Sequence, residues 1–257
     1  MSAGEVRLSV TGGIATVVFD RPAARNAMTW TMYREFEDAC VAIAGDASVG
    51  VVMLRGAGGT FISGTDIAQF SAFDGAQAGL DYEVRIDAAM EALERLPVPT
   101  LAVVEGAAMG GGLAVAAACD LRIASPDARF GVPIARTVGN CLSMANVARL
   151  VAGFGAPRAK RLMLLADVIR ADEALACGFV QEIVPPAELE GRAAELCGRL
   201  LAHAPVTMRC AKEAIRRLVI AALPRDEDLI AAAYGSRDFK EGISAFMAKR
   251  QPKWEGR

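Results

Sequence analysis

The stretch of sequence that decides the fold runs Glu105-Gly106-Ala107-Ala108-Met109-Gly110-Gly111-Gly112-Leu113, with three glycines between an apolar strand pattern and an alanine-rich helix pattern. Glycine allows a ligand to approach the backbone closely. The free N–H groups at a helix N-terminus favour an anion, or an oxygen on which negative charge develops. This stretch therefore predicts either an anion-accepting turn or, equally, a turn whose glycines only permit tight packing of strand on helix.

A second glycine-containing loop, Thr60-Phe61-Ile62-Ser63-Gly64-Thr65-Asp66-Ile67, follows an earlier apolar run at residues 49–55. We expect both loops at the same edge of a parallel sheet, where each can present a backbone N–H group. Two convergent donors form an oxyanion hole, and removing one donor costs about 3–4 kcal/mol of barrier in acyl-transfer enzymes. Read alone, the loop also fits an ordinary turn.

The rest of the chain predicts an α/β fold in which helices cover a mostly parallel sheet. A hairpin is expected at residues 6–20, a helix after the N-cap Thr29, and a further helix where Leu80, Val84, Ala88 and Ala92 recur at spacing four. Strands are expected at 49–55, 100–104 and 179–184, and helices at 157–165 and 171–176. Only helices follow residue 186, at 187–203, 205–222, 226–233 and 238–249.

The charge and the cysteine content of the chain disfavour several classes of function. The 257 residues carry a formal net charge of −2, which gives no footprint for nucleic acid or for an anionic membrane. Six scattered cysteines show neither a disulfide framework nor metal-ligand spacing, so we expect no metal site and a reducing cytoplasm. The first residues lack a secretory pattern, and no apolar run is long enough to span a membrane.

The chain resembles the enoyl-CoA hydratase/isomerase (crotonase) superfamily over nearly its whole length. That family carries a loop F-x-x-G-x-D-[IL] and a segment E-G-x-A-x-G-G-G followed by C-D. Here the matches are Phe61 with Gly64-Thr65-Asp66-Ile67, and Glu105-Gly106 with Gly110-Gly111-Gly112 and Cys119-Asp120. Further matches are Asp20-Arg21-Pro22, Asn26-Ala27, Phe130-Gly131-Val132-Pro133 and the segment at residues 239–252.

The resemblance implies a crotonase-like spiral of ββα units at residues 1–186, with a CoA-thioester site. It implies a helical region at 187–257 for oligomerisation and closure over CoA, and a homotrimer or dimer of trimers. The backbone N–H groups of Thr65 and Gly111 would form the oxyanion hole for the thioester carbonyl. Coenzyme A would enter as part of the substrate, and no separate cofactor is implied. The binding residues implied are Asn26, Ala27, Gly64, Asp66, Ile67, Phe246 and Lys249, and Asp66 and Asp120 are expected to anchor their loops through backbone N–H groups.

The sequence departs from the family where hydratases carry two glutamates. Ala114 and Ile134 occupy those positions, and neither can transfer a proton. We therefore look for another acid or base at residues 136–143. Cys141 is a candidate nucleophile if a helix N-terminus lowers its pKa, with simple burial as the alternative. Arg136 is a candidate partner for a substrate carboxylate or for a surface ion pair, and Asn140 either positions a substrate or caps a helix.

The first hypothesis is an enzyme that stabilises a thioester enolate with non-standard acid/base residues. Its reaction is left open among hydration, isomerisation, decarboxylation and thioester hydrolysis. The second hypothesis is a catalytically silent protein that binds CoA esters. A nucleotide-binding Rossmann fold is disfavoured because Gly110-Gly111-Gly112 does not have G-x-G-x-x-G spacing.

Overall fold

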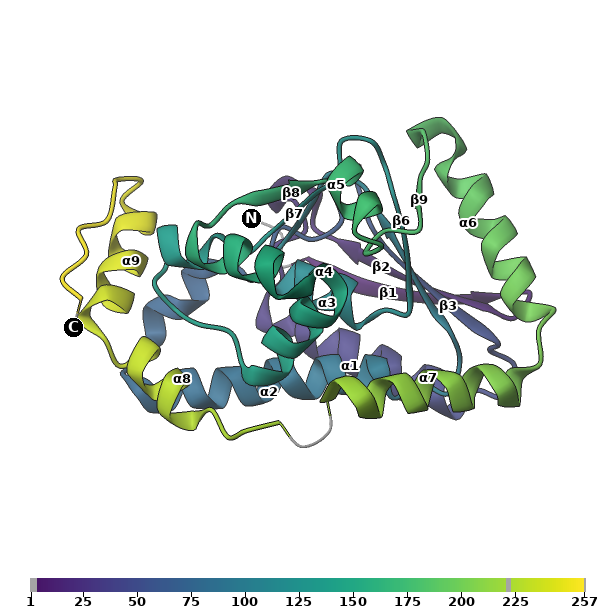
Figure 1. Ribbon diagram of the computed structural model, residues 1–257, viewed down its shortest axis with the longest axis horizontal. Helices are drawn as coiled ribbons and strands as arrows, with labels where there is room; N and C mark the ends of the chain where they lie inside the picture. The colour runs from purple at the N-terminus through teal and green to yellow at the C-terminus, as the bar shows by residue number, and fades with distance from the viewer. Residues whose placement is uncertain (1–3, 221–222, 257) are drawn as a thin grey trace.

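A six-stranded sheet lies at the centre of the computed structural model, which describes residues 4–220 and 223–256 (Figure 1). The strand order is β1-β2-β3-β4-β6-β9; β1 and β2 form the predicted antiparallel hairpin, and every other pairing is parallel. The bounds are β1 Glu5–Thr11, β2 Ile14–Asp20, β3 Val51–Gly56, β4 Thr100–Val104, β6 Leu121–Ala124 and β9 Glu182–Ile183. The predicted α/β fold with a mostly parallel sheet is confirmed.

A second sheet of three short strands was not predicted. It has the order β5-β7-β8, with β5 at Ala107–Met109, β7 at Arg129–Gly131 and β8 at Val168–Arg170. Strand β5 lies inside the glycine-rich stretch and pairs in parallel with β7. Three-residue strands are too short to show an alternating pattern, so the sequence contains no signal for them.

Helices cover the large sheet on both sides and bury two apolar clusters. The larger cluster lies under α1 to α5 and α8 to α9, while a smaller one lies between the other face of the sheet and α6. The α-helices are α1 Trp30–Gly45, α2 Ala76–Glu94, α3 Gly111–Ala118, α4 Met144–Leu164, α5 Ala171–Ala176, α6 Pro186–Leu201, α7 Pro205–Ile220, α8 Glu227–Tyr234 and α9 Arg237–Met247, and the short 3-10 helices are η1 Pro22–Ala24, η2 Ile67–Ala72 and η3 Pro133–Arg136.

Local signals set several helix ends. The predicted N-cap Thr29 is confirmed, because its side chain accepts a hydrogen bond from the backbone N–H of Met32. Helix α4 begins at Met144, well before the predicted position 157, since the kink at Gly155 and Pro157 looks like a helix start in the sequence. The predicted strand at 179–184 shortens to β9.

The four helices predicted after residue 186 are confirmed within a few residues, except that 221–222 lie outside the described residues. Helix α6 packs on the smaller cluster, whereas α8 and α9 place Ile230, Tyr234, Phe239 and Ile243 in the larger one. Figure 1 shows α6 and α9 at opposite ends of the molecule. The functional division at residue 186 remains a prediction. In the described part of the chain, no helix combines the length and the apolar character needed to span a bilayer.

Candidate active site

The two glycine-containing loops meet directly, as the sequence predicts. The backbone N–H of Met109 donates to Ile62 O at 3.0 Å, and the N–H of Ile62 donates to Ala107 O at 3.0 Å. Glycine is required at this contact, because a Cβ atom on Gly112 would lie 2.1 Å from Ile62 O. Gly64 adopts a φ of +116°, and a Cβ atom there would lie 3.3 Å from Met109 O.

Thr65 and Gly111 lie side by side where the loops meet. A Cβ atom on Gly111 would lie 3.3 Å from Thr65 Oγ1 and 2.5 Å from the hydroxyl oxygen of Tyr33. Gly111 is the first residue of α3, so its N–H has no partner within the helix. Among the described residues, no acceptor is bonded to the backbone N–H of either Thr65 or Gly111. The geometry is therefore that of two adjacent free donors at a helix N-terminus.

Two tyrosine hydroxyl groups fix the position of Thr65. Its Oγ1 is 2.8 Å from the hydroxyl of Tyr33 on α1 and 2.9 Å from the hydroxyl of Tyr82 on α2. The backbone N–H of Asp66 donates to Met28 O at 2.9 Å, which holds the next residue of the loop. Two helices and one neighbouring loop thus restrain this donor before any ligand binds.

A cavity of about 90 Å³ opens beside these donors. Gly64, Thr65, Ile67, Gly110 and Gly111 form its wall on the side of the two loops. Ala114 and Ile134, the two residues that the resemblance predicts at the positions of the hydratase glutamates, also line it and add only apolar surface. Among the described residues that line the cavity, Glu83 on α2 is the single carboxylate.

Glu83 is almost fully buried, with 3% of its surface exposed. The hydroxyl of Tyr234 on α8 donates to its Oε1 at 2.6 Å, and the backbone N–H of Ser143 donates to its Oε2 at 3.2 Å. Burial raises the pKa of Glu83 to about 8, and the two donated hydrogen bonds only partly offset this. Near neutral pH this carboxyl group therefore exchanges between its acid and base forms.

The three residues predicted at positions 136–143 have different environments. Asn140 lines the cavity and donates from Nδ2 to the hydroxyl of Tyr234 at 3.0 Å, while its buried Oδ1 has no partner among the described residues. Cys141 is not among the lining residues, and its thiol lies 3.9 Å from Leu229 O. The lowered pKa considered for Cys141 is wrong, because burial raises the pKa of this thiol to about 12. Arg136 is exposed and lies outside the cavity wall.

Asn26 and Asp66 hold the loops that carry the donors. Asn26 is fully buried; its Nδ2 donates to Ala57 O, Thr60 O and Phe61 O at 2.9, 2.6 and 3.1 Å. Asp66 accepts from the backbone N–H of Ala68 at 3.1 Å and forms an ion pair with Arg21, whose Nη1 also donates to Ala27 O. The loop-anchoring role predicted for Asp66 is confirmed in this contact. The part of Asn26 and Ala27 in binding CoA remains a prediction.

Asp120 shows the same anchoring behaviour. Its Oδ2 accepts from the backbone N–H of Thr100 at 2.8 Å, and Lys212 of α7 lies 2.8 Å from the same oxygen. Phe246 and Lys249, at the end of α9, are exposed in the chain and make no contact that tests their predicted part in closing a CoA site. No group of three or more metal-ligand side chains occurs in the described ranges.

Sequence reasoning missed Glu83, Tyr82 and Tyr234. The series Leu80, Val84, Ala88 and Ala92 correctly indicates α2, but Val84 and Ala88 lie on its exposed side. The buried residues of the helix are Gly79, Tyr82, Glu83, Ile86, Ala89, Met90 and Leu93. Their spacing of three and four marks the buried stripe, and a glutamate within that stripe is the signal that would have identified the site.

Comparisons with known proteins agree with this fold. A family model described as "Enoyl-CoA hydratase/isomerase" matches residues 9–257. The short-chain-enoyl-CoA hydratase of Clostridium acetobutylicum is 33% identical over 256 residues, covering 98% of this chain and 97% of that protein. The crystal structure of an enoyl-CoA hydratase from Mycobacterium avium subsp. paratuberculosis K-10 is 29% identical with a TM-score of 0.82, covering 97% of this chain and 98% of that one. A methylmalonyl-CoA decarboxylase, solved with 2-nitronate-propionyl-CoA, is similar in fold, with a TM-score of 0.89 at 24% identity and coverage of 98% of both chains.

Proposed function

Because the chain belongs to the enoyl-CoA hydratase/isomerase family, we propose that it is an enzyme that binds an acyl-CoA thioester and stabilises the enolate of that thioester. The observation that carries this proposal is the pair of free backbone N–H groups on Thr65 and Gly111, side by side at the mouth of an apolar cavity. Such preorganised donors act most strongly on an oxygen that gains negative charge in the transition state. The thioester carbonyl becomes such an oxygen when the enolate forms.

The rest of the proposed assembly follows from the family. Asn26, Ala27, Asp66 and Ile67 would hold the CoA part near the loops, and Phe246 and Lys249 would close over it. A homotrimer or a dimer of trimers would bring the last two residues to a neighbouring subunit. Coenzyme A would be present only as part of the substrate.

The first test is removal of one proposed donor. Replacing Gly111 with proline removes its N–H, and proline is tolerated at the first position of a helix. Because any Cβ there would clash with the hydroxyl of Tyr33, the comparison is made in a Tyr33→Phe background. We expect Gly111→Pro to lower the turnover of crotonyl-CoA, or of the thioester that proves most active, by about 10²–10³-fold relative to Gly111→Ala.

Gly111→Ala is the matched control, because it adds a Cβ atom but keeps the N–H. Turnover would be followed by the absorbance of the conjugated thioester, with 3-enoyl-CoA and malonyl-type CoA esters tested in parallel to identify the reaction. Equal rates for the alanine and proline variants would refute the oxyanion hole. Tight binding without turnover of any thioester would instead indicate a silent CoA-ester-binding protein.

A further inference from the structure

We propose that Glu83 is the catalytic carboxylate of this site, which takes a proton from the α-carbon of the bound acyl thioester and returns it to a substrate carbon. This inference rests on the proposed enolate-stabilising function and adds the group that moves the proton. Its geometric basis is that Glu83 lines the same cavity as Thr65 and Gly111, and is the single carboxylate among the described lining residues.

Helix α2 brings Glu83 to the site through its neighbour. The hydroxyl of Tyr82 lies 2.9 Å from Thr65 Oγ1, so this turn of α2 is fixed directly against the proposed oxyanion hole. Ala114 and Ile134 leave the cavity without a proton-transfer group on the side of α3 and η3. A carboxylate supplied from α2 fills the chemical role that those two positions lack.

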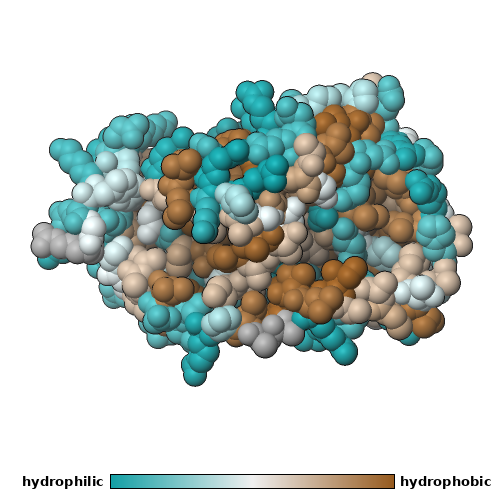
Figure 2. All heavy atoms as spheres, viewed as in Figure 1, coloured by the Kyte–Doolittle hydropathy of each residue, from teal (hydrophilic) through white to brown (hydrophobic). Residues whose placement is uncertain are grey.

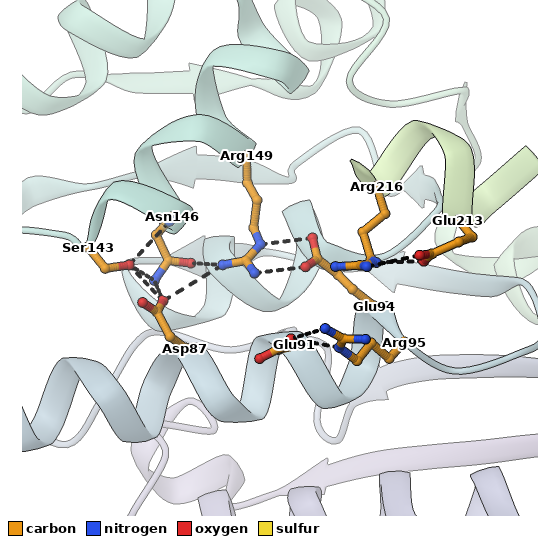
Figure 3. A network of polar contacts seen from close by, with 9 residues as sticks. All are labelled: Asp87, Glu91, Glu94, Arg95, Ser143, Asn146, Arg149, Glu213 and Arg216. Atoms are coloured by element: carbon orange, nitrogen blue, oxygen red, sulfur yellow. Dashed lines mark hydrogen bonds and ion pairs between the residues drawn. The ribbon is translucent and has the colours of Figure 1, made fainter. Parts of the chain in front are cut away.

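The surroundings of Glu83 differ from those of a structural buried carboxylate. Glu94 on the same helix has a cationic partner, because Arg149 pairs with it in a bidentate manner at 2.9 and 2.8 Å (Figure 3). No arginine or lysine in the described ranges forms an ion pair with Glu83. A buried carboxylate that serves only stability normally has such a partner, because an unpaired buried charge is costly.

The groups that face Glu83 come from three helices and from the segments before α4 and α8. They are Tyr82 and Asp87 on α2, Tyr33 on α1, Tyr234 on α8, Asp226 before α8, and Asn140, Cys141 and Ser143 before α4. All of them are neutral polar groups or acids. Desolvation is therefore the largest contribution to the raised pKa of Glu83. This pKa of about 8 lies near the pH at which general acid–base catalysis is most effective.

The proposed proton transfer is complete with the groups that the site contains. The carboxylate of Glu83 accepts the α-proton, and the electron pair of the C–H bond becomes the enolate, whose oxygen accepts hydrogen bonds from the N–H groups of Thr65 and Gly111. Glu83, now a carboxylic acid, returns a proton to the α-carbon, or to the γ-carbon of a 3-enoyl thioester with migration of the double bond. One group is sufficient for this reaction, and no further reactant is needed.

The experiment measures proton transfer and carbonyl polarisation separately. Incorporation of deuterium from D₂O into 3-butenoyl-CoA reports proton transfer at carbon. The vibrational frequency of the thioester C=O of bound crotonyl-CoA reports the oxyanion hole, whether or not a proton moves. We expect Glu83→Gln to lower deuterium incorporation by about 10²–10⁴-fold and to retain the lowered C=O frequency. Glu91→Gln is the matched control, because Glu91 lies on the same helix, is exposed and pairs with Arg95.

The outcomes are distinct. Deuterium incorporation by Glu83→Gln within about 3-fold of the wild-type rate, with the lowered frequency retained, would overturn the role of Glu83. A wild-type protein that polarises the carbonyl but incorporates no deuterium would do the same. A wild-type protein that leaves the C=O frequency unchanged would overturn the proposed function itself.

Tyr234 is a positioning residue in this scheme, and its variant gives a second test. The base form of Glu83 starts the reaction, so the wild-type exchange rate should rise with pH and level off above about 8. Tyr234→Phe keeps the ring but removes the hydrogen bond that lowers the pKa of Glu83. We expect this variant to move the break in the pH profile to higher pH. An unchanged break with an unchanged rate would contradict proton transfer by Glu83.

Discussion

The carboxyl group of Glu83 couples the folded state to pH, whatever its part in catalysis. Its pKa is raised in the folded protein from 4.5 to about 8, chiefly because burial disfavours the charged form. The folded state therefore holds this proton more tightly than the unfolded chain does. The stability that this provides is fully present below pH 4.5 and is lost as pH rises toward 8.

We expect Glu83→Gln to remove this pH dependence. Between pH 5 and pH 8 the wild-type free energy of unfolding should fall relative to that of the variant by about 1.4 kcal/mol per pH unit, a few kcal/mol in all. Urea denaturation of both proteins at pH 5, 6.5 and 8 measures the difference. A difference that stays constant over this range would contradict the raised pKa of Glu83.

Helices α2 and α4 are joined by a network of charged and polar side chains, and the Glu213–Arg216 pair of α7 lies beside it (Figure 3). Arg149 of α4 lies at its centre with 3% of its side chain exposed; it pairs with Glu94 of α2 and donates to Asn146 Oδ1 at 2.9 Å. Ser143, the N-cap of α4, donates from Oγ to Asp87 at 2.6 Å and from its backbone N–H to Glu83. The network therefore fixes α2 against α4 at the level of the cavity.

We expect very different losses of stability when either of two arginines in Figure 3 is replaced. Arg149→Met leaves Glu94, whose side chain is 12% exposed, without its bidentate partner, so we expect a loss of about 3 kcal/mol in the free energy of unfolding. Arg95→Met removes an exposed i,i+4 pair with Glu91 and should cost less than about 0.5 kcal/mol. Chemical denaturation compares them, and the double variant Arg149→Met/Glu94→Leu should recover much of the loss. Equal costs for the two single variants would contradict this account.

The sequence predicts the helices and strands more completely than it predicts how they pack against one another. Some signals act locally and can be read from the sequence itself. They are the helix cap at Thr29, the strand at residues 100–104 and the turn with glycines at 110–112. Glu83, Ser143 and Tyr234 are separated by tens of residues, and only the packing of α2, α4 and α8 joins them. The proposed oxyanion donors could be located from the sequence because both lie in short motifs, whereas the proposed base depends on long-range contacts that no local pattern records.

At the scale of the molecule, α7 is the least covered of the described α-helices. None of its residues is buried, and Val206, Ile215 and Leu218 expose large apolar side chains. Figure 2 shows hydrophobic residues gathered over the lower part of this face, near α7. An amphipathic helix with an uncovered apolar side fits the proposed trimer, in which it would contact a second copy of the chain.

We expect Ile215→Glu/Leu218→Glu to change the mass of the particle in solution. Light scattering coupled to size-exclusion chromatography should give a trimer or hexamer for the wild type and a smaller species for the double variant. Val168→Glu is the matched control, since Val168 is exposed on β8, at the top of Figure 1 and far from α7, and should not alter the mass. A wild-type protein with the mass of a single chain would refute the assembly.

The lone carboxylate of the cavity also has a stereochemical consequence. An enolate is planar, and one carboxyl group fixed on α2 reaches only one of its two faces. The hydrogen would then be removed and returned on that same face, so migration of a double bond would be suprafacial. Part of the original hydrogen would return before it is replaced from solvent, because Glu83 is shielded from water. With a substrate labelled stereospecifically at the α-carbon, we therefore expect removal of only one of the two α-hydrogens. Part of that label should be transferred to the γ-carbon without exchange with solvent.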